Sequence, residues 1–208
     1  FGDWELKELV CSCKKSDGEP ALIAKKRTSS DITIRPLIGD GSYDSEECIA
    51  ILSSTDIVVT NPPFSKSQEF IKLLIQLDKQ FLIVCNRNTV VTKAIFPFFK
   101  DGKLKYGFGF RGNTANFIIP PSLYGHYSKD VVRGEQNVVR FRNVTWLTNM
   151  NVKAPCVDRT YNKKYKPRKY PKYDQYDAIN VDKIVDIPYD YYGEMGVPIT
   201  FLEGFDYN

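Results

Sequence analysis

The sequence predicts an α/β protein: a doubly wound sheet, then antiparallel strands, then an irregular basic and aromatic appendage. Three observations support this. Short apolar runs alternate with amphipathic segments through the first 100 residues, as strands and helices do in doubly wound folds. Aromatic-rich runs separated by Gly and Pro follow them. From about residue 151 the periodicity ends, and basic residues are interleaved with tyrosines.

Length and composition suit one domain with a small appendage. The chain has 208 residues, of which 42% are hydrophobic, enough for a core. We expect residues 1–150 to form the core domain and residues 151–208 the appendage. No apolar run could span a membrane and no secretory signal opens the sequence, so we expect a cytoplasmic protein without membrane contact.

The cysteines favour free thiols over a disulfide framework. They are odd in number, and their spacing with the single histidine, His126, gives no zinc pattern. We therefore expect reduced thiols and no metal site. The five are Cys11, Cys13, Cys48, Cys85 and Cys156.

The first elements are read from short apolar segments. Residues 3–9 predict the end of a helix and residues 9–13 a short buried strand. Residues 31–40 alternate apolar side chains and predict a strand, weakened by a proline. Residues 42–54 predict a helix with Asp44 or Ser45 as its N-cap.

The middle of the chain continues the alternation. The β-branched run 56–60 predicts a buried parallel strand, and Phe70, Ile71, Leu74 and Ile75 form a helical apolar stripe after it. A second buried strand and a helix stopped by Pro97 come next. Aromatic-rich segments then predict antiparallel additions to the sheet. These elements correspond to residues 81–85, 92–99, 103–110, 115–120 and 138–149.

The stretch DIVVTNPPFSKSQEF, residues 56–70, places Asn61, Pro62, Pro63 and Phe64 between a predicted strand and a predicted helix. Ligands of open α/β sheets lie beyond the carboxyl ends of strands. An Asn side-chain oxygen and a proline carbonyl make a paired acceptor for a planar NH₂ group, and Phe64 can stack on the ring that carries it. The alternative is a sharp turn with Asn61 as a helix N-cap. The preceding strand and the following aromatic residue favour the ligand site.

This arrangement suits alkylation of an exocyclic amine such as that of adenine. The amine lone pair is delocalised into the ring, so the nitrogen is a poor nucleophile. Accepting both of its N–H hydrogens localises the pair for attack on a sulfonium methyl. No general base is needed first, because the proton leaves after the nitrogen has become cationic.

The stretch T-N-P-P-F after DIVV resembles the [Asp/Asn]-Pro-Pro-[Tyr/Phe] motif of S-adenosylmethionine-dependent amino-methyltransferases. A longer resemblance, from near residue 37 to residue 202, is to the EcoRI-type adenine-specific DNA modification methylases. It consists of the blocks GDGSYDSEECI, DIVVTNPPFS, FLIVCNRN, WLTN, YPKYDQYDAINVDK and MGVPITFL in the family's order. The resemblance implies a Rossmann-like methyltransferase sheet and S-adenosylmethionine as cofactor.

The resemblance also implies roles for single residues. Asn61 and the Pro62 carbonyl would hold the target amine, and Phe64 would stack on a flipped base, with Pro63 completing the catalytic motif. Asp40, in the turn IGDG, matches an acidic position that binds the cofactor adenine, with an ordinary turn aspartate as the alternative. We group Thr60 with Asp40 as a cofactor-binding residue.

Part of the cofactor half departs from the family pattern. Residues 6–13 would be its second strand, but Cys13 and Lys14 stand where an acid usually grips the ribose, and Asp17 and Glu19 are weak substitutes. The first strand and its turn are expected upstream of Phe1. The sequence as given is therefore expected to bind cofactor weakly or not at all.

The appendage has the composition of a nucleic-acid contact. Residues 151–175 carry eight Lys or Arg against two acids, and residues 176–208 carry one Lys against seven acids. Tyr165 and Tyr170 could stack or wedge, and a solvated loop is the alternative. Duplex DNA is the expected partner, since extruding an adenine costs a few kcal/mol that a gripping segment can offset. The expected phosphate contacts are Lys163, Lys164, Lys166, Arg168, Lys169 and Lys172.

The predicted function is a bacterial or phage-encoded DNA adenine-N6 methyltransferase of restriction–modification type, with a separately acting restriction endonuclease as a potential partner. Two alternatives stay open. One keeps the corner but changes the substrate to RNA adenine or a protein glutamine amide. The other is a DNA-binding remnant without activity.

Overall fold

The computed structural model of this chain describes residues 6–15, 19–27, 31–107, 114–127, 137–151 and 159–202. It is a mixed α/β protein, as the sequence predicts, but its strands form several sheets where the sequence predicts one. The chain falls into two compact units, one of residues 1–58 and 70–80, the other of residues 59–69 and 81–208. The division at residue 150 stays a prediction. No helix in the described ranges is long and apolar enough to cross a membrane.

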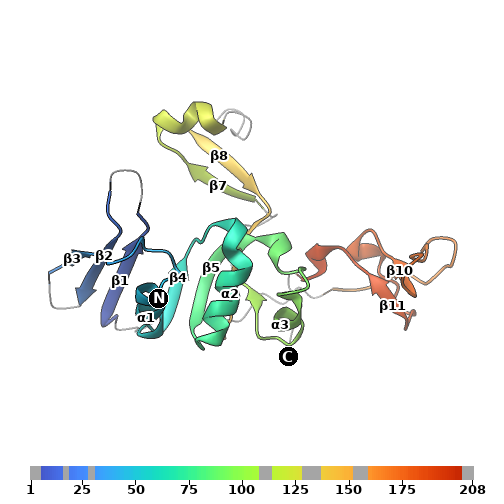
Figure 1. The fold of residues 1–208 in the computed structure, drawn as a ribbon. Coiled ribbons are helices and arrows are strands. Elements are labelled where there is room, and N and C mark those ends of the chain that lie inside the picture. The colour runs from blue at the N-terminus through green and yellow to red at the C-terminus, as the bar shows by residue number, and fades with distance from the viewer. Residues whose placement is uncertain are drawn as a thin grey trace. The chain divides into compact units, whose positions relative to one another are not determined.

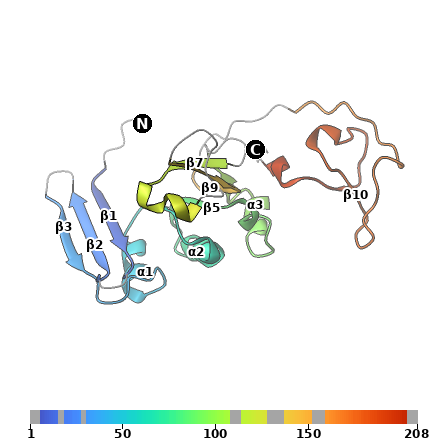
Figure 2. The same ribbon diagram turned by 90° about the horizontal axis from the view of Figure 1, so that it is seen from above.

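The first sheet has three antiparallel strands in the order β1-β2-β3 (Figure 1 and Figure 2, blue). Its strands are β1 (Glu8–Cys13), β2 (Leu22–Arg27) and β3 (Thr33–Pro36). One face carries Ile23, which packs with Leu37 and Cys48 in a small core. The strand signals at 9–13 and 31–40 are thus confirmed.

The other face of this sheet is apolar and open to solvent. The strand register places Cys11 opposite Ala24, and Ala24 opposite Ile34, which is 65% exposed. The prediction that residues 9–13 are buried is therefore wrong. The predicted helix at 3–9 is also wrong in its described part, because β1 already begins at Glu8. β2 is absent from the sequence prediction, since its lysines and arginine obscure the apolar alternation.

Helix α1 (Glu46–Ser53) forms where the sequence predicts it. The Oγ atom of Ser45 accepts a hydrogen bond of 3.3 Å from the Cys48 N–H, so Ser45 is the N-cap and not Asp44. Glu46 and Glu47 place negative charge at the positive end of the helix.

A four-stranded sheet has the order β4-β5-β9-β6. β5 pairs antiparallel with β9, and β9 pairs antiparallel with β6, as expected of the later strands. One face of β5 is fully buried: Phe81, Ile83 and Cys85 are each 0% exposed. The strands are β4 (Ile57–Thr60), β5 (Gln80–Asn86), β6 (Lys105–Tyr106) and β9 (Val144–Thr148).

Helix α2 (Ser67–Gln76) connects β4 to β5 and confirms the predicted apolar stripe. Phe70 is 4% exposed, and Ile71 and Leu74 are 0% exposed. A strand, a helix and a returning strand form the crossover that a parallel pair of strands requires.

Two polar side chains fasten the start of β5 to the end of β9. The Thr148 hydroxyl donates to the Phe81 carbonyl at 2.5 Å and accepts from the Met150 N–H at 3.1 Å. The Asn149 side-chain oxygen accepts from the Phe81 N–H at 2.8 Å. The backbone groups of Phe81 are thus satisfied at the point where the strand enters the core.

Proline begins helix α3 (Phe96–Lys100) and does not stop it. Pro97 lies in the first turn, where its missing N–H would have no helical partner. The prediction of a helix ended by Pro97 is wrong for this reason. Phe99, on the helical side of the proline, is 1% exposed.

Two further strands, β7 (Thr114–Ile118) and β8 (Val138–Arg142), form an antiparallel pair. Strands are thus confirmed in the aromatic-rich segments 115–120 and 138–149, but β7 and β8 form a sheet of their own and do not extend the main sheet. The second segment holds two strands, β8 and β9, and not one. Phe117 and Phe141 contact each other edge to face at 5.6 Å between ring centroids. The predicted strand at 103–110 is confirmed for β6, and residues 108–110 lie outside the described residues.

The segment 159–202 has a small core of its own. Its centre is Tyr170, Ile179, Val181 and Ile187, with side chains from the same segment packed around them. A short parallel pair, β10 (Ala178–Asn180) and β11 (Glu194–Gly196), lies in this segment (Figure 1, orange to red).

Candidate functional site

The corner after β4 presents two side chains to solvent. Asn61 is exposed and Phe64 is 44% exposed, whereas Pro62 is buried and anchors the bend. Thr60, the last residue of β4, is half-buried. The Asn61 amide makes no hydrogen bond to the described residues and does not cap the following helix. The N-cap alternative is therefore wrong, because Pro63 occupies that position without a side-chain bond.

The two proline carbonyls have different surroundings. The Pro63 carbonyl accepts from the Lys66 N–H at 2.9 Å and lies 3.5 Å from the Ser67 hydroxyl. Ser67 is 0% exposed, so the residue that follows this turn is anchored in the protein interior. The Pro62 carbonyl lies outside the turn. Among the described residues, the turn thus engages the Pro63 carbonyl and not the Pro62 carbonyl.

Asp40 lies in a tight turn that its own carboxylate stabilises. Its Oδ1 accepts from the Ser42 N–H at 2.9 Å, and its Oδ2 is 3.6 Å from the Lys14 Nζ. The Lys15 N–H donates to the Asp40 carbonyl at 2.8 Å. Gly41 has φ of 74°, and a side chain there would meet the Cys13 carbonyl at 2.7 Å. Asp40 thus makes the hydrogen bonds of an ordinary turn aspartate, which was the alternative interpretation. Its two carboxylate oxygens can still accept further hydrogen bonds.

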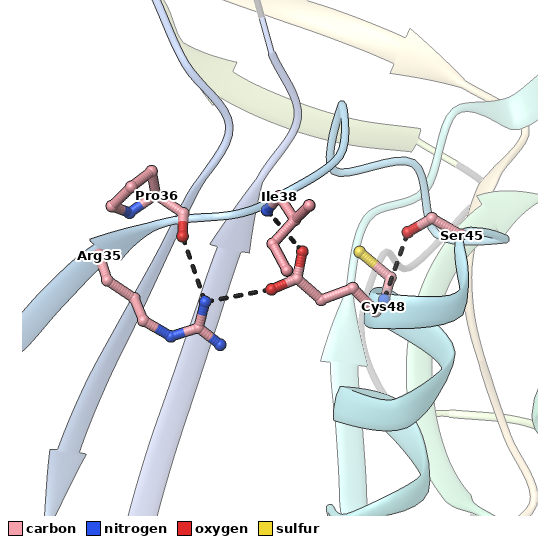
Figure 3. Close-up of polar contacts among 6 residues, drawn as sticks. Arg35, Pro36, Ile38, Ser45 and Cys48 are labelled. Atoms are coloured by element: carbon pink, nitrogen blue, oxygen red, sulfur yellow. Dashed lines mark hydrogen bonds and ion pairs between the residues drawn. The ribbon is translucent and has the colours of Figure 1, made fainter.

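Glu47 of helix α1 contacts Arg35 and Ile38, which lead into this turn (Figure 3). One oxygen accepts from the Ile38 N–H at 2.7 Å, and the other accepts from the Arg35 guanidinium at 3.1 Å. The Ile38 N–H, followed by Arg35, holds the pKa of Glu47 below its ordinary value. Arg35 also donates to the Pro36 carbonyl at 3.2 Å, so β3 and α1 are tied at this end.

The end of β5 holds a buried cation that sequence reasoning missed. Arg87 follows the strand directly and is 2% exposed, with its guanidinium carbon 5.7 Å from the centroid of the Tyr106 ring. Burial lowers the pKa of Arg87 and raises the pKa of Tyr106 to about 12. The Arg87 N–H donates to the Asn143 carbonyl at 2.8 Å. The sequence feature that could have indicated this buried cation is an arginine close behind the apolar run of residues 81–85.

The α2 crossover makes β4 and β5 candidates for a parallel pair, whose carboxyl ends would share one edge of the sheet. Asn61 follows β4 at that edge, and Asn86 and Arg87 stand at the end of β5. The Asn86 side chain accepts from the Asn88 N–H at 2.9 Å and caps a short helical turn. This edge therefore combines the Asn61 amide, which has no partner among the described residues, with the helical turn that Asn86 caps.

The six predicted DNA-contacting cations separate into two groups. Lys169 pairs with Asp186 at 2.8 Å, and Lys172 pairs with Asp177 at 2.6 Å. The other four are exposed and form no ion pair with the described residues; they are Lys163, Lys164, Lys166 and Arg168. Sequence reasoning treated the six alike because the paired acids lie later in the chain.

Tyr165 and Tyr170 do not face solvent as rings presented for stacking. Tyr170 is 3% exposed, and its hydroxyl donates to the Asp186 carbonyl at 2.7 Å. The half-buried Tyr165 ring stacks on it at 5.8 Å and contacts Tyr191 at 4.6 Å. The expectation that these two tyrosines stack on nucleic acid is wrong, because they form the core of the appendage.

The cysteines and acids of the described residues form no metal cluster: no group of three or more His, Cys, Asp or Glu side chains could hold an ion there. Cys11 and Cys13 are exposed free thiols, and Cys48 and Cys85 are buried free thiols. Cys156 lies outside the described residues.

Comparison with known proteins gives the class of the chain. A model of the family described as adenine-specific methyltransferase EcoRI matches residues 3–208. The class is that of adenine-specific DNA methyltransferases. More particularly, the chain belongs to the EcoRI methylase family, which confirms the resemblance drawn from the sequence.

Three curated relatives are similar over most of the chain. Type II methyltransferase M.EcoRI of Escherichia coli is 42% identical over 226 residues, covering 99% of this chain and 69% of the relative. M.MpnI of Mycoplasma pneumoniae is 39% identical, covering 82% of this chain and 55% of the relative. M.MgeORF184P of Mycoplasma genitalium is 37% identical, covering 84% and 56%. No solved structure matches the chain significantly.

Proposed function

We propose that this chain is the catalytic and DNA-contacting part of a site-specific methyltransferase. It transfers a methyl group from S-adenosylmethionine to the N6 atom of a flipped-out adenine in duplex DNA, as part of a restriction–modification system. Family membership supports the reaction class. The observation that carries the proposal is the exposed Asn61 amide beside a Pro62 carbonyl that the following turn does not use.

The proposed mechanism assigns the work to three residues. The Asn61 side-chain oxygen and the Pro62 carbonyl accept the two hydrogens of the adenine amine and raise the nucleophilicity of its nitrogen. Phe64, 44% exposed, stacks on the extruded base and fixes its plane. Buried Pro62 and the Pro63 turn fix the backbone of the corner before substrate arrives, so the backbone loses little freedom on binding. The amine proton leaves to solvent once the nitrogen is cationic.

The residues of the Asp40 turn fit the adenosine part of the cofactor. S-adenosylmethionine, when bound, supplies an electrophilic methyl carbon on a sulfonium. An adenine amine needs an acceptor, and the Asp40 carboxylate is 52% exposed with spare lone pairs. Thr60 is half-buried at the end of β4, and its assignment to the cofactor stays a prediction.

The proposed architecture is Rossmann-like, with β4, α2 and β5 as one strand–helix–strand unit of a doubly wound sheet. Binding at the carboxyl ends of the strands is the rule for such sheets. The position of Asn61 directly after β4 agrees with that rule. The antiparallel β9 and β6 extend the sheet beyond β5.

The appendage is proposed to grip the duplex through the cations that form no ion pair with the described residues. Each lysine or arginine that neutralises a phosphate releases a counterion, which supplies affinity without reading sequence. Lys163, Lys164, Lys166 and Arg168 are available for this role. Lys169 and Lys172 are engaged by carboxylates and serve the fold of the appendage.

Two alternatives differ in substrate or activity. RNA adenine and a protein glutamine amide offer a similar planar NH₂ group to the corner, and the exposed cations favour nucleic acid over the amide. A DNA-binding remnant without activity is the other alternative. A restriction endonuclease of the same specificity is the proposed functional partner, acting separately on the same sites.

The test is transfer of labelled methyl groups from S-adenosylmethionine by the full-length protein to duplex DNA, RNA and protein in parallel. The proposal expects label in DNA alone, recovered as N6-methyladenine after digestion to nucleosides. Label in RNA or protein would overturn the substrate assignment. DNA binding with no transfer to any acceptor would favour the remnant.

A further inference from the structure

Two segments far apart in the appendage sequence lie side by side. Lys163 and Pro188 form a parallel β-bridge, and the Tyr189 N–H donates to the Lys163 carbonyl at 3.0 Å. Next to this bridge, the Tyr165 N–H donates to the Asp190 carboxylate at 2.7 Å. Residues 163–166 are thereby held against residues 188–190.

The tyrosines of residues 163–166 and 188–192 divide into an inner and an outer set. Tyr165 and Tyr191 contact each other in the core of the appendage. Tyr189 is 51% exposed and Tyr192 is 98% exposed. The sequence interleaves cations with tyrosines that turn out to be internal, and the fold supplies two outward tyrosines from the other segment.

Two acids of this region have partners. Asp190 accepts from the Tyr165 N–H, and Asp186 pairs with Lys169. Lys163 and Lys164 are exposed. The backbone contact thus brings exposed Tyr189 next to exposed Lys163, and exposed Tyr192 follows three residues after Tyr189. Cations and aromatic rings together bind phosphate and nucleobase.

We propose that Tyr189 and Tyr192 are aromatic contacts of the DNA, placed beside phosphates held by Lys163, Lys164 and Lys166. This rests on the proposed function and adds to it the side chains that the DNA meets. A tyrosine ring has two side-chain torsions and a flat face, so it stacks on a base or packs on a deoxyribose at small entropic cost. Such contacts are sequence-tolerant and complement the lysines.

Two other exposed tyrosines differ in their surroundings. The Tyr173 hydroxyl donates to the Asn180 side-chain oxygen at 2.8 Å, which holds it within the appendage. Tyr176 is 69% exposed but adjoins Asp177, which pairs with Lys172. Tyr176 is thus an exposed tyrosine next to an acid that is already in an ion pair, and it serves as a matched control.

The experiment measures duplex DNA affinity by fluorescence anisotropy over a series of salt concentrations. The double variant Y189A/Y192A is expected to bind about tenfold or more weakly, with an unchanged slope of log affinity against log salt. The variant Y189F/Y192F keeps the rings and is expected to bind within about twofold of wild type. Y176A is expected to bind as wild type.

The triple variant K163Q/K164Q/K166Q is expected to flatten the salt slope by about three, near one unit per lysine. Circular dichroism of each variant checks that the appendage is folded. Wild-type affinity in folded Y189A/Y192A, with the lysine effect present, would overturn the inference and leave the proposed function standing. Absence of DNA binding by the wild type would overturn both.

Discussion

Thr148→Val is expected to destabilise the protein by about 2 kcal/mol. Thr148 is 0% exposed, and its hydroxyl donates to the Phe81 carbonyl and accepts from the Met150 N–H. Valine keeps the shape and the strand propensity but leaves both backbone groups without this partner. A buried polar group left unsatisfied costs about 1–3 kcal/mol, and Met150 is only partly buried, so its share is at the low end.

Urea denaturation measures this loss. With an m value of about 1–3 kcal/mol per molar urea, a loss of about 2 kcal/mol moves the midpoint by about 1 M. Thr145→Val is the matched control on the same strand, because Thr145 is half-buried and its hydroxyl makes only a 3.3 Å contact with the Trp146 carbonyl. A midpoint for Thr148→Val equal to that of Thr145→Val would refute the reasoning.

Two other predictions concern thiols and acid. Native protein treated with a thiol reagent should be labelled at Cys11 and Cys13 and not at Cys85, because burial raises the pKa of the Cys85 thiol to about 12; peptide mass spectrometry checks this, and labelling at Cys85 would count against the buried β5. The Lys169 ammonium lowers the pKa of Asp186 in the folded state, so stability from this pair is present above about pH 3.9 and is lost as the pH falls through the lower folded value. Asp186→Asn should therefore weaken the pH dependence of stability in acid, measured by denaturation at several pH values; an unchanged dependence would contradict the pairing.

The elements that the sequence predicts correctly are those with strong local signals. The β5 run is apolar throughout and sits where expected, and α2 shows its stripe at Phe70, Ile71 and Leu74. Ser45 caps α1 because its hydroxyl reaches the Cys48 N–H, a local interaction. Patterns within about ten residues were enough in these cases.

The errors come from interactions that local patterns do not contain. β2 ends in Lys25, Lys26 and Arg27, and its strand state depends on pairing with β1 and β3. Pro97 can begin a helix or end one, and only the residues after it decide which. The antiparallel neighbours of β1 could not be read from its own sequence.

The same difference between local patterns and long-range contacts decides which parts of the candidate site the sequence predicts. Asn61, Pro62 and Phe64 are contiguous, so the sequence alone indicated which side chains share a corner. The internal position of Tyr170 and the exposure of Tyr192 depend on a fold that joins residues far apart in the chain. Composition marks such a segment as basic and aromatic but does not say which rings face solvent.

The central claim is that the Asn61 amide acts on the substrate and not on the fold. Its side chain is exposed and makes no hydrogen bond to the described residues, so Asn61→Ala should change the free energy of unfolding by less than about 0.5 kcal/mol. Loss of a positioned hydrogen-bond partner of the reacting group is expected to lower the methyl-transfer rate by about 10²–10³. Asn61→Asp keeps an acceptor oxygen and should retain more activity than Asn61→Ala.

The single-turnover rate of methyl transfer to duplex DNA, measured for wild type, Asn61→Ala and Asn61→Asp, tests this claim most directly. A large loss in the alanine variant at unchanged stability, with partial retention in the aspartate variant, is the predicted result. An alanine variant that transfers methyl groups as fast as wild type would contradict it.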